Sequence, residues 1–330
     1  MKIKTLAALA GVSPSTVSKA FSGSHEVSEA TRERIFALAR ENGVFDKYDK
    51  HKFSKRIIAV ICPDMRRDYY NEVVNALKKE LEARGCMTLV SISDFSPEKR
   101  DELYSYYTAY ARVDGVIVLS NTLDVDPDTL MIPTVLYTKH PTQAPCVDSI
   151  FLNIQPAIVD ALRHLQSLGH EHIGFIGHFR AEHRREEFLR ATKSLGMSIR
   201  ENDIRMSKEM FEKAGAETVR AWLSEGNAPT AIIAAYDYVA IGAMHALQEA
   251  GYRVPEDFAV VGMDNIPRAA YLTPSLSSIG FPTEQACHMA IDLLMKKIND
   301  KYYSAPNEIQ LRAEFICRKS SGVPRKPEKN

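Results

Sequence analysis

Short apolar runs that alternate with amphipathic segments limit the fold of this chain more than any other feature of its sequence. The runs are rich in β-branched residues, as parallel strands are when helices cover both faces of their sheet. They lie at residues 57–61, 87–90, 114–119, 133–137, 173–177, 231–235 and 259–262. The segments between them predict helices at residues 71–84, 97–110, 156–168, 185–195, 215–224 and 239–250. This alternation predicts an α/β fold built on parallel sheets.

The alternation restarts near residue 170, where the run at residues 173–177 opens a second series of strands and helices. We therefore expect two similar Rossmann-like lobes. Lobes of this kind bind a ligand between them, at the carboxyl ends of the parallel strands.

Polar and aromatic side chains beside these strand ends are the candidates for ligand contact. The carboxylate of Asp264, just after the last apolar run, can accept hydrogen bonds from two hydroxyl groups. The other candidates are Ser120, Arg184, Asp237, Tyr69 and Tyr70. Two alternatives stay open, because Asp237 also fits the N-cap of the following helix and each tyrosine also fits packing within the lobes.

Residues 6–21 carry a different pattern, which predicts two short helices joined by a tight turn. Gly11 tolerates the left-handed conformation at the end of the first helix. Ser13 followed by Pro14 is typical of an N-cap and the first residue of a helix. The outward face of the second helix is short, polar and cationic, with Ser15, Thr16, Ser18 and Lys19. Two helices in this arrangement are typical of the helix-turn-helix motif, whose second helix enters the DNA major groove. A helical hairpin with a purely structural role stays an alternative.

A third helix is expected at residues 29–42, with Ser28 as its cap, so that three helices complete a small all-α headpiece. The charge distribution agrees with a DNA-facing head. Residues 1–56 carry 11 Lys and Arg against 6 Asp and Glu, a net charge of +5, and the remainder carries 31 against 36, a net charge of −5. A basic head on an acidic body fits a head that meets phosphate groups.

The five cysteines are odd in number and widely spaced, which argues against a disulfide framework and for a reducing cytoplasm. The chain begins with an amphipathic segment rather than a signal peptide, and no apolar run is long enough to span a membrane. No Walker A or G-x-S-x-G motif occurs, and the histidines at positions 170, 172, 178 and 183 lack partners that would complete a metal site. We therefore expect a cytoplasmic protein that is not an enzyme and holds no metal or cofactor.

The segment at residues 11–43, GVSPSTVSKAFSGSHEVSEATRERIFALARENG, resembles the headpiece of the lac repressor/gal repressor family of bacterial transcription regulators. Further similar segments lie at residues 113–117, 168–177, 240–244, 254–265 and 272–276. The resemblance implies a helix-turn-helix headpiece over residues 1–45, a hinge or linker over 46–56, and a two-lobed, periplasmic-binding-protein-like domain over 57–322. Lobe 1 would comprise about residues 57–153 and 283–311, and lobe 2 about 154–282 and 312–322.

The resemblance also implies roles for headpiece residues. Ser13 and Thr16 would hold phosphates, while Pro14, Ser15 and Lys19 would face base edges. Pro14 can read a base only by apolar contact, for instance with a thymine methyl, and Lys19 reaches guanine acceptors as a point charge without the fork of an arginine. The remaining expected DNA contacts are Lys4, Thr5, Ser18 and His25.

The linker of the family forms a short hinge helix on DNA and inserts an apolar side chain into the minor groove. Phe53 takes that place here, but the usual Pro-Asn…Ala-Arg-x-Leu pattern is missing, so a flexible basic linker is equally open. Residues 323–330, VPRKPEKN, form a polar tail without the apolar heptads of a tetramerising helix, so a homodimer is expected.

For the effector, the resemblance points to Tyr70, Arg184, Asp264 and the pair Tyr236 and Asp237. Thr138 stands where some sugar-binding members have aspartate, and a sugar is expected because the family favours sugars. The predicted function is a repressor that binds a pseudo-palindromic operator in double-stranded DNA under the control of this effector. Two alternatives stay open: a solute-binding or sugar-sensing protein without regulatory DNA binding, and a cytoplasmic enzyme. The basic head opposes the first, and the absence of a catalytic constellation opposes the second.

Overall fold

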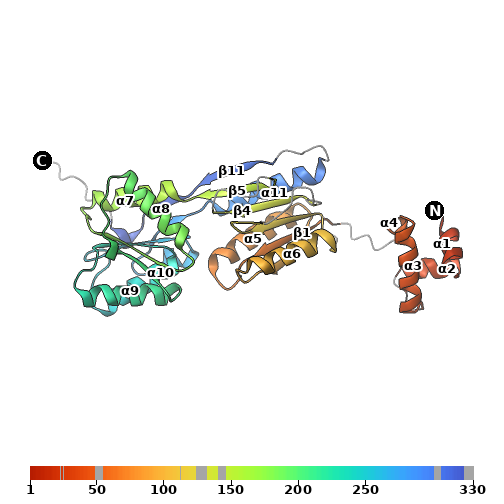
Figure 1. Cartoon of the computed structure of the whole chain (residues 1–330), viewed down its shortest axis with the longest axis horizontal. Coiled ribbons are helices and arrows are strands. Elements are labelled where there is room, and N and C mark those ends of the chain that lie inside the picture. Colours follow the sequence, from red (N-terminus) through yellow and green to blue (C-terminus); the bar gives the residue numbers. More distant parts are fainter. Residues whose placement is uncertain are drawn as a thin grey trace. The chain divides into compact units, whose positions relative to one another are not determined.

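The computed structural model describes residues 1–22, 24, 26–48, 55–111, 113–123, 132–139, 146–300 and 306–322. These residues belong to two compact units, Met1–Arg56 and Ile57–Asn330 (Figure 1). The predictions for His25, for Phe53 with most of the linker, and for the tail at residues 323–330 lie outside the described residues. No helix in the described part of the chain has the length and apolarity that crossing a membrane requires.

The described residues of the first unit form four helices: α1 (Ile3–Leu9), α2 (Pro14–Phe21), α3 (Glu29–Glu41) and α4 (Phe45–Tyr48). Gly11 has a φ angle of +63° in the turn between α1 and α2, as the sequence predicts. Leu6, Val17, Phe21 and Ile35 are buried between the helices. The periodic apolar positions thus produce one small core.

The aromatic residues of α4 extend this core beyond the predicted end of the headpiece. The ring of Phe45 lies 5.5 Å from that of Phe21 and 5.0 Å from that of Phe36. The hydroxyl of Tyr48 donates a hydrogen bond of 2.7 Å to the carbonyl of Met1. The helical unit therefore runs as far as Tyr48, into the segment that the sequence assigns to the linker.

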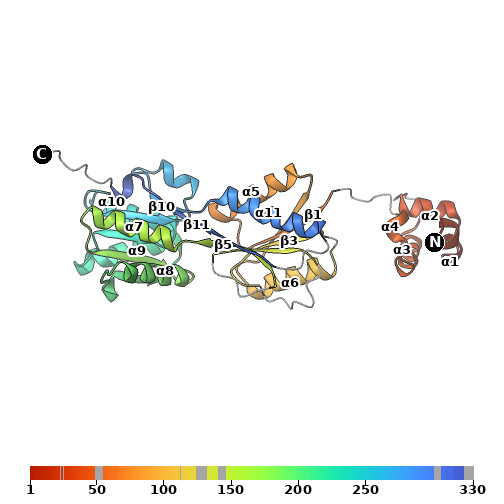
Figure 2. The same cartoon turned by 90° about the horizontal axis from the view of Figure 1, so that it is seen from above.

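Lobe 1 of the second unit is a parallel sheet with strand order β11-β5-β4-β3-β1-β2. The strands are β1 (Ile57–Cys62), β2 (Met87–Ile92), β3 (Gly115–Leu119), β4 (Thr134–Thr138), β5 (Asp148–Asn153) and β11 (Glu308–Arg312). Helices α5 (Asp68–Ala83) and α11 (Thr283–Asn299) cover one face, and α6 (Pro97–Ala109) covers the other (Figure 2). Side chains alternate between the two apolar layers, as a period of two requires.

Lobe 2 repeats this topology with strand order β12-β10-β9-β8-β6-β7, in which only β12 runs antiparallel to its neighbour. The strands are β6 (Ile173–His178), β7 (Ile204–Ser207), β8 (Ala231–Ala234), β9 (Ala259–Met263), β10 (Ser277–Gly280) and β12 (Glu314–Ile316). The helices are α7 (Gln155–Ser167), α8 (Glu182–Ser194), α9 (Phe211–Glu225) and α10 (Asp237–Glu249), with short 3₁₀ turns at Glu201–Asp203, Pro267–Tyr271 and Lys319–Ser321. Figure 1 shows α7 and α8 on one face of this sheet and α9 and α10 on the other.

The chain passes between the lobes at three places: between β5 and α7, between β10 and α11, and between β11 and β12. In each sheet the strand order reverses beside the first strand, which is where ligands bind in open α/β sheets. The predicted fold class, a helix-turn-helix headpiece followed by two Rossmann-like lobes of the periplasmic-binding-protein type, is confirmed.

Helices α9 and α10 approach closely because two glycines lie at their crossing. A Cβ atom on Gly242 would lie 1.8 Å from the carbonyl oxygen of Glu212, and one on Gly215 would lie 1.9 Å from that of Val239. No side chain fits at such distances, so glycine at both positions sets the spacing of the two helices.

Some element boundaries differ from the sequence predictions. Helix α5 begins at Asp68 rather than at residue 71, so Tyr69 and Tyr70 lie in its first turn. Helix α8 begins at Glu182 rather than at residue 185, so Arg184 lies inside the helix instead of before it. Neither helix has a side-chain cap that would mark its start. Strands β5, β7, β10, β11 and β12 and helix α11 were not predicted. Of these, β7, β11 and β12 lie at the edges of their sheets and lack a continuous apolar run.

Candidate functional site

The outward face of α2 and its approach carry the predicted DNA contacts. Lys4, Thr5, Ser13, Pro14 and Ser15 are exposed, and Thr16, Ser18 and Lys19 are half-buried. The hydroxyl of Ser13 accepts a 3.0 Å hydrogen bond from the backbone N–H of Thr16 and lies 2.8 Å from the Thr16 hydroxyl. Both hydroxyls thus lie at the amino-terminal turn of α2, where backbone N–H groups and the helix dipole favour phosphate.

Lys19 has an intramolecular partner on this face. Its ammonium lies 2.5 Å from the carboxylate of Glu26, and the side chains are 44% and 69% exposed. An exposed ion pair contributes about 0–1 kcal/mol, so Lys19 can exchange Glu26 for an acceptor on DNA with little loss.

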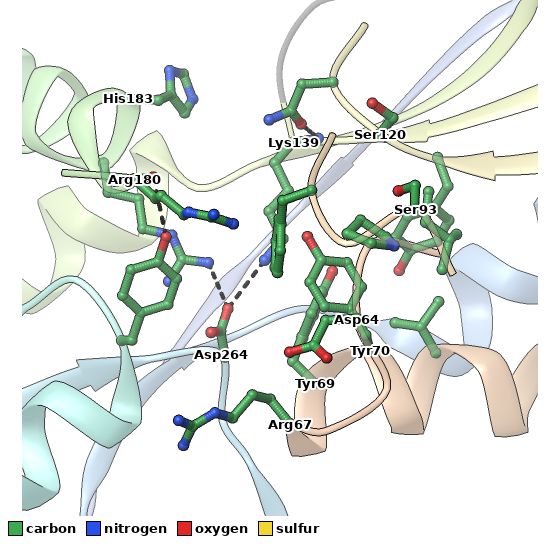
Figure 3. Close-up of a pocket in the computed structure, with 18 of the residues that line it drawn as sticks. Asp64, Arg67, Tyr69, Tyr70, Ser93, Ser120, Lys139, Arg180, His183 and Asp264 are labelled. Carbon is green, nitrogen blue, oxygen red and sulfur yellow. Dashed lines mark hydrogen bonds and ion pairs between the residues drawn. The ribbon is translucent and has the colours of Figure 1, made fainter. Parts of the chain in front are cut away.

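A cavity of about 480 Å³ lies between the two lobes (Figure 3). Its lobe 1 wall comes from the carboxyl ends of β1, β3 and β4 and the start of α5. Its lobe 2 wall comes from the ends of β6, β8 and β9 and the first turn of α8. This volume is in the range of small-molecule sites.

Asp264 lies at the centre of this cavity, directly after β9, with a φ angle of +106° that side-chain-bearing residues rarely adopt. Its carboxylate accepts a 2.6 Å hydrogen bond from Arg184 of lobe 2 and a 3.1 Å hydrogen bond from the ammonium of Lys139 of lobe 1. Figure 3 shows both bonds converging on the carboxylate. The two lobes therefore meet at one buried ionic cluster.

The charges of this cluster perturb one another. Burial alone would raise the pKa of Asp264, but the adjacent Arg184 and Lys139 outweigh it and hold that pKa below its usual value. Burial lowers the pKa of Lys139 to about 7, with Asp264 opposing the shift and Arg184 adding to it. One carboxylate is therefore shared by two buried cations.

Aromatic rings hold the cations of the cavity. The Lys139 ammonium lies 3.6 Å from the ring centre of Tyr69, and the Arg184 guanidinium lies 4.2 Å from that of Tyr236. Such contacts stabilise a cation by about 0.5–2 kcal/mol, depending on its exposure.

Two further contacts of this kind join the lobes. Arg67, which precedes α5 in lobe 1, lies 3.7 Å from the ring centre of Phe211 in lobe 2. Arg180, which follows β6 in lobe 2, lies 4.4 Å from the ring centre of Phe95 in lobe 1. These two contacts therefore bridge the lobes on the wall of the cavity.

Two histidines also line the cavity. Burial, together with the charges of Arg184 and Arg180, lowers the pKa of His178 to about 4. Burial, together with Arg184 and Arg190, lowers the pKa of His183 to about 4. Both rings are therefore neutral near pH 7. Among the described residues, no group of three or more His, Cys, Asp or Glu side chains could hold a metal ion.

Six of the predicted effector residues line the cavity together: Tyr69, Tyr70, Ser120, Arg184, Tyr236 and Asp264. Thr138 does not, because its side chain is buried in the sheet and its hydroxyl lies 3.4 Å from the amide oxygen of Asn121. The next residue, Lys139, faces the cavity instead, as the alternation of a strand requires.

Asp237 also lies outside the cavity and is not a helix cap. Its carboxylate is fully buried and accepts hydrogen bonds from the N–H of Ile266 at 2.7 Å and from the hydroxyl of Ser278 at 2.6 Å. Tyr236 is the cap residue of α10, and no side chain caps that helix. Asp237 therefore joins β10 to the turn after β9, and burial raises its pKa to about 7.

Sequence reasoning missed Lys139, Arg180 and Arg67. Lys139 directly follows β4 and Arg180 follows β6, so the rule that ligands bind at carboxyl ends of strands could have found both. Arg67 lies between β1 and α5, directly before the predicted Tyr69 and Tyr70, so the same rule could have found it too.

Comparisons with known proteins agree for both units. Residues 2–43 match the family described as bacterial regulatory proteins, lacI family, and residues 162–321 match the periplasmic binding protein-like domain. The HTH-type transcriptional repressor PurR of Yersinia pestis is 28% identical over 334 residues, which cover 96% of each chain. That of Photobacterium profundum is 26% identical over 330 residues, which cover 96% of this chain and 98% of the relative. The chain carries a LacI-family DNA-binding domain and a periplasmic-binding-protein-like domain.

Solved structures share the fold of this chain over nearly its whole length. The transcriptional regulator CelR–cellobiose complex matches with a TM-score of 0.68 and 25% identity, over 97% of this chain and 99% of that one. The lac repressor dimer bound to operator and an anti-inducer matches with a TM-score of 0.70 and 22% identity, over 98% and 99%. This protein is a DNA-binding transcriptional repressor, and its named relatives are regulators rather than enzymes.

Proposed function

We propose that this LacI-family repressor binds a pseudo-palindromic operator in double-stranded DNA as a homodimer, and that a carbohydrate in the interlobe cavity controls its operator affinity. The main support for this proposal is the ionic cluster in which Lys139 of lobe 1 contacts Asp264, the partner of Arg184, in lobe 2. These residues line a cavity of ligand size. A ligand that contacts both lobes changes the free energy of their relative orientation. Coupling of this kind typically amounts to ~1–3 kcal/mol.

The chemistry of the cavity supports a carbohydrate. The Asp264 carboxylate and the Arg184 guanidinium offer an acceptor and donors to neighbouring hydroxyl groups. Tyr70, which lines the cavity, provides aromatic surface for the apolar face of a sugar ring. The CelR structure, which matches 97% of this chain, is a complex with cellobiose.

The headpiece supports the operator part of the proposal. We assign phosphate contacts to the amino-terminal turn of α2 and base contacts to its exposed face. The proposed DNA contacts are Lys4, Thr5, Ser13, Pro14, Ser15, Thr16, Ser18, Lys19, His25 and Phe53. Two headpieces related by a two-fold axis require symmetric half-sites.

An exposed apolar edge supports the dimer. Met87, Val90 and Ile92 of the edge strand β2 are exposed, as are Tyr106 and Tyr110 on α6 and just beyond its end. An uncovered apolar edge strand is prone to pair with another chain, and a second copy would cover it. We place the protein in the cytoplasm, where operator DNA lies and where the odd number of widely spaced cysteines can stay reduced.

A gel-shift titration of the full chain on a selected operator, at two salt concentrations and with a panel of sugars, tests this function. Asp264→Ala should lower sugar affinity by about tenfold or more, since it leaves polar groups of the ligand and of Arg184 unpaired. Asp160→Ala, which removes an exposed carboxylate of α7, is the matched control and should behave as wild type.

The same variant reports the sign of the switch. If sugar releases the repressor, Asp264→Ala should stay on the operator when sugar is added; if sugar acts as a co-repressor, the variant should fail to bind. A wild-type chain that binds no operator sequence specifically would overturn the proposed function. Equal sugar affinity in Asp264→Ala and wild type would move the effector site away from this cavity.

A further inference from the structure

The described wall of the interlobe cavity carries more cations than carboxylates. The cations are Arg67, Arg100, Lys139, Arg180 and Arg184, and the carboxylates are Asp64 and Asp264. Of these cations, Arg100 is neutralised by Asp101, at 2.7 and 2.9 Å, and Arg67 forms an ion pair with Glu212 at 3.6 Å. The carboxylate of Asp64 is already paired with Arg66, at 2.8 Å. Asp264 alone is left to balance Lys139 and Arg184.

Arg180 is the cation whose charge is least compensated. Its guanidinium lies over the rings of Phe95 and Phe179, at 4.4 and 5.5 Å, and no carboxylate among the described residues forms an ion pair with it. Figure 3 shows its side chain reaching from lobe 2 into the cavity, beside the cluster of Asp264 and Lys139. A ring face stabilises a cation without occupying its N–H groups, so these donors remain available to a ligand.

Together with burial, the positive charges of the cavity lower the pKa of the two histidines that line it. Arg180 and Arg184 add to burial in lowering the pKa of His178, and Arg184 and Lys139 do so at His183. Burial lowers the pKa of Lys139, and the positive charge of Arg184 adds to this shift. A negative charge placed here would be attracted by Arg180, Arg184 and the protonated form of Lys139, in a partly desolvated site where Coulomb interactions are strong.

We propose that the effector carries an anionic group, a phosphate ester or a carboxylate, which binds between Arg180 of lobe 2 and Lys139 of lobe 1. The inference rests on the proposed function, because it places the effector in the same cavity. A guanidinium binds both kinds of anion through two parallel N–H groups, and the ammonium adds a point charge. The anion adds a second negative charge beside that of Asp264. Because Arg180 and Lys139 belong to different lobes, an anion bound to both joins the lobes.

Calorimetry on the full chain tests this with inorganic phosphate and with a matched set of glucose, glucose 6-phosphate and glucuronate. Phosphate should bind saturably, and an anionic sugar should bind at least tenfold more tightly than glucose. The preference between glucose 6-phosphate and glucuronate distinguishes a phosphate from a carboxylate. Arg180→Ala, whose side chain is exposed, should lower phosphate affinity by about tenfold or more, and Lys139→Met should lower it as well.

Arg220→Ala is the control, because it removes the same charge from lobe 2 at an exposed position paired with Glu249 and outside the cavity. It should leave phosphate affinity unchanged. Phosphate binding that survives in both Arg180→Ala and Lys139→Met, or the absence of saturable binding by phosphate and both anionic sugars, overturns the inference.

The failure of this inference is distinct from the failure of the proposed function. One outcome would be a neutral sugar that changes operator affinity and whose binding depends on Asp264 but not on Arg180. This outcome would leave the proposed function in place and would overturn the inference that the effector carries an anionic group. A chain that binds no operator overturns the proposed function whatever anions it binds.

Discussion

Replacing Lys139 with methionine tests whether the lobes meet at Asp264 as the structure has them. The Lys139 ammonium is enclosed by Asp264 at the end of β9, Arg184 on α8 and the ring of Tyr69 on α5. His183 contacts its backbone from α8. Burial lowers the lysine pKa from its ordinary 10.5 to about 7 in the folded chain.

This shift makes stability depend on pH with a defined sign. Above pH 7 the folded chain releases the proton of Lys139, whereas the unfolded chain keeps it up to a pKa of 10.5. The unfolded state then binds about one more proton, so the free energy of unfolding rises with pH by about 1.4 kcal/mol per unit across this window. Below pH 7 both states are protonated and the contribution to the slope vanishes. Methionine has no proton to release, so Lys139→Met removes the slope.

Urea denaturation at about pH 7.5, 8.5 and 9.5 measures this difference, with the slope taken from the linkage relation. Trp222 is the single tryptophan of the chain and is buried in lobe 2, so its fluorescence reports the unfolding of that lobe. From the lowest to the highest pH, the wild type should gain about 3 kcal/mol relative to Lys139→Met. Lys78→Met, at an exposed lysine of α5, should run parallel to the wild type.

Parallel pH dependences for the wild type and Lys139→Met would refute the reasoning. They would mean that Lys139 stays protonated in the folded chain across this range, so that burial does not lower its pKa as the structure implies.

Three further expectations concern the headpiece, the packing of lobe 2 and the assembly. Lys19→Ala should weaken operator binding in gel shifts by roughly 1–3 kcal/mol. The control Glu26→Gln only releases Lys19 and should not weaken binding. Equal operator affinity of Lys19→Ala and wild type would show that Lys19 does not contact DNA. Gly242→Ala should lower the Tm, since its Cβ would lie 1.8 Å from the Glu212 carbonyl and overpacking typically costs about 1–3 kcal/mol; an unchanged Tm would show that α9 and α10 can separate freely. Light scattering should give a dimer of about 74 kDa, twice the 37.0 kDa chain, and a stable tetramer would contradict the reading of the C-terminal tail.

The sequence alone predicts the architecture, because the signals that determine it are local. Strand runs, helical spacing and the Ser13–Pro14 start of α2 each depend on residues a few positions apart, and the structure forms those elements. The restart of the alternation near residue 170 predicts two lobes, and both sheets indeed have the same strand order. The predicted helix starts were wrong where no side-chain cap marks them, as at α5 and α8. The edge strands β7, β11 and β12 were missed because they are half-exposed and carry no continuous apolar run.

Only the tertiary structure decides which polar residues share the cavity. Asp237 and Asp264 both follow apolar strands, and local pattern cannot distinguish them. The left-handed turn at Asp264 brings its carboxylate to Arg184, 80 residues away, and to Lys139, 125 residues away, whereas Asp237 is enclosed by Ile266 and Ser278. Charges and burial act through space rather than along the chain, so the partners of Asp264, and the excess of positive charge around it, exist only once the two lobes have folded against each other.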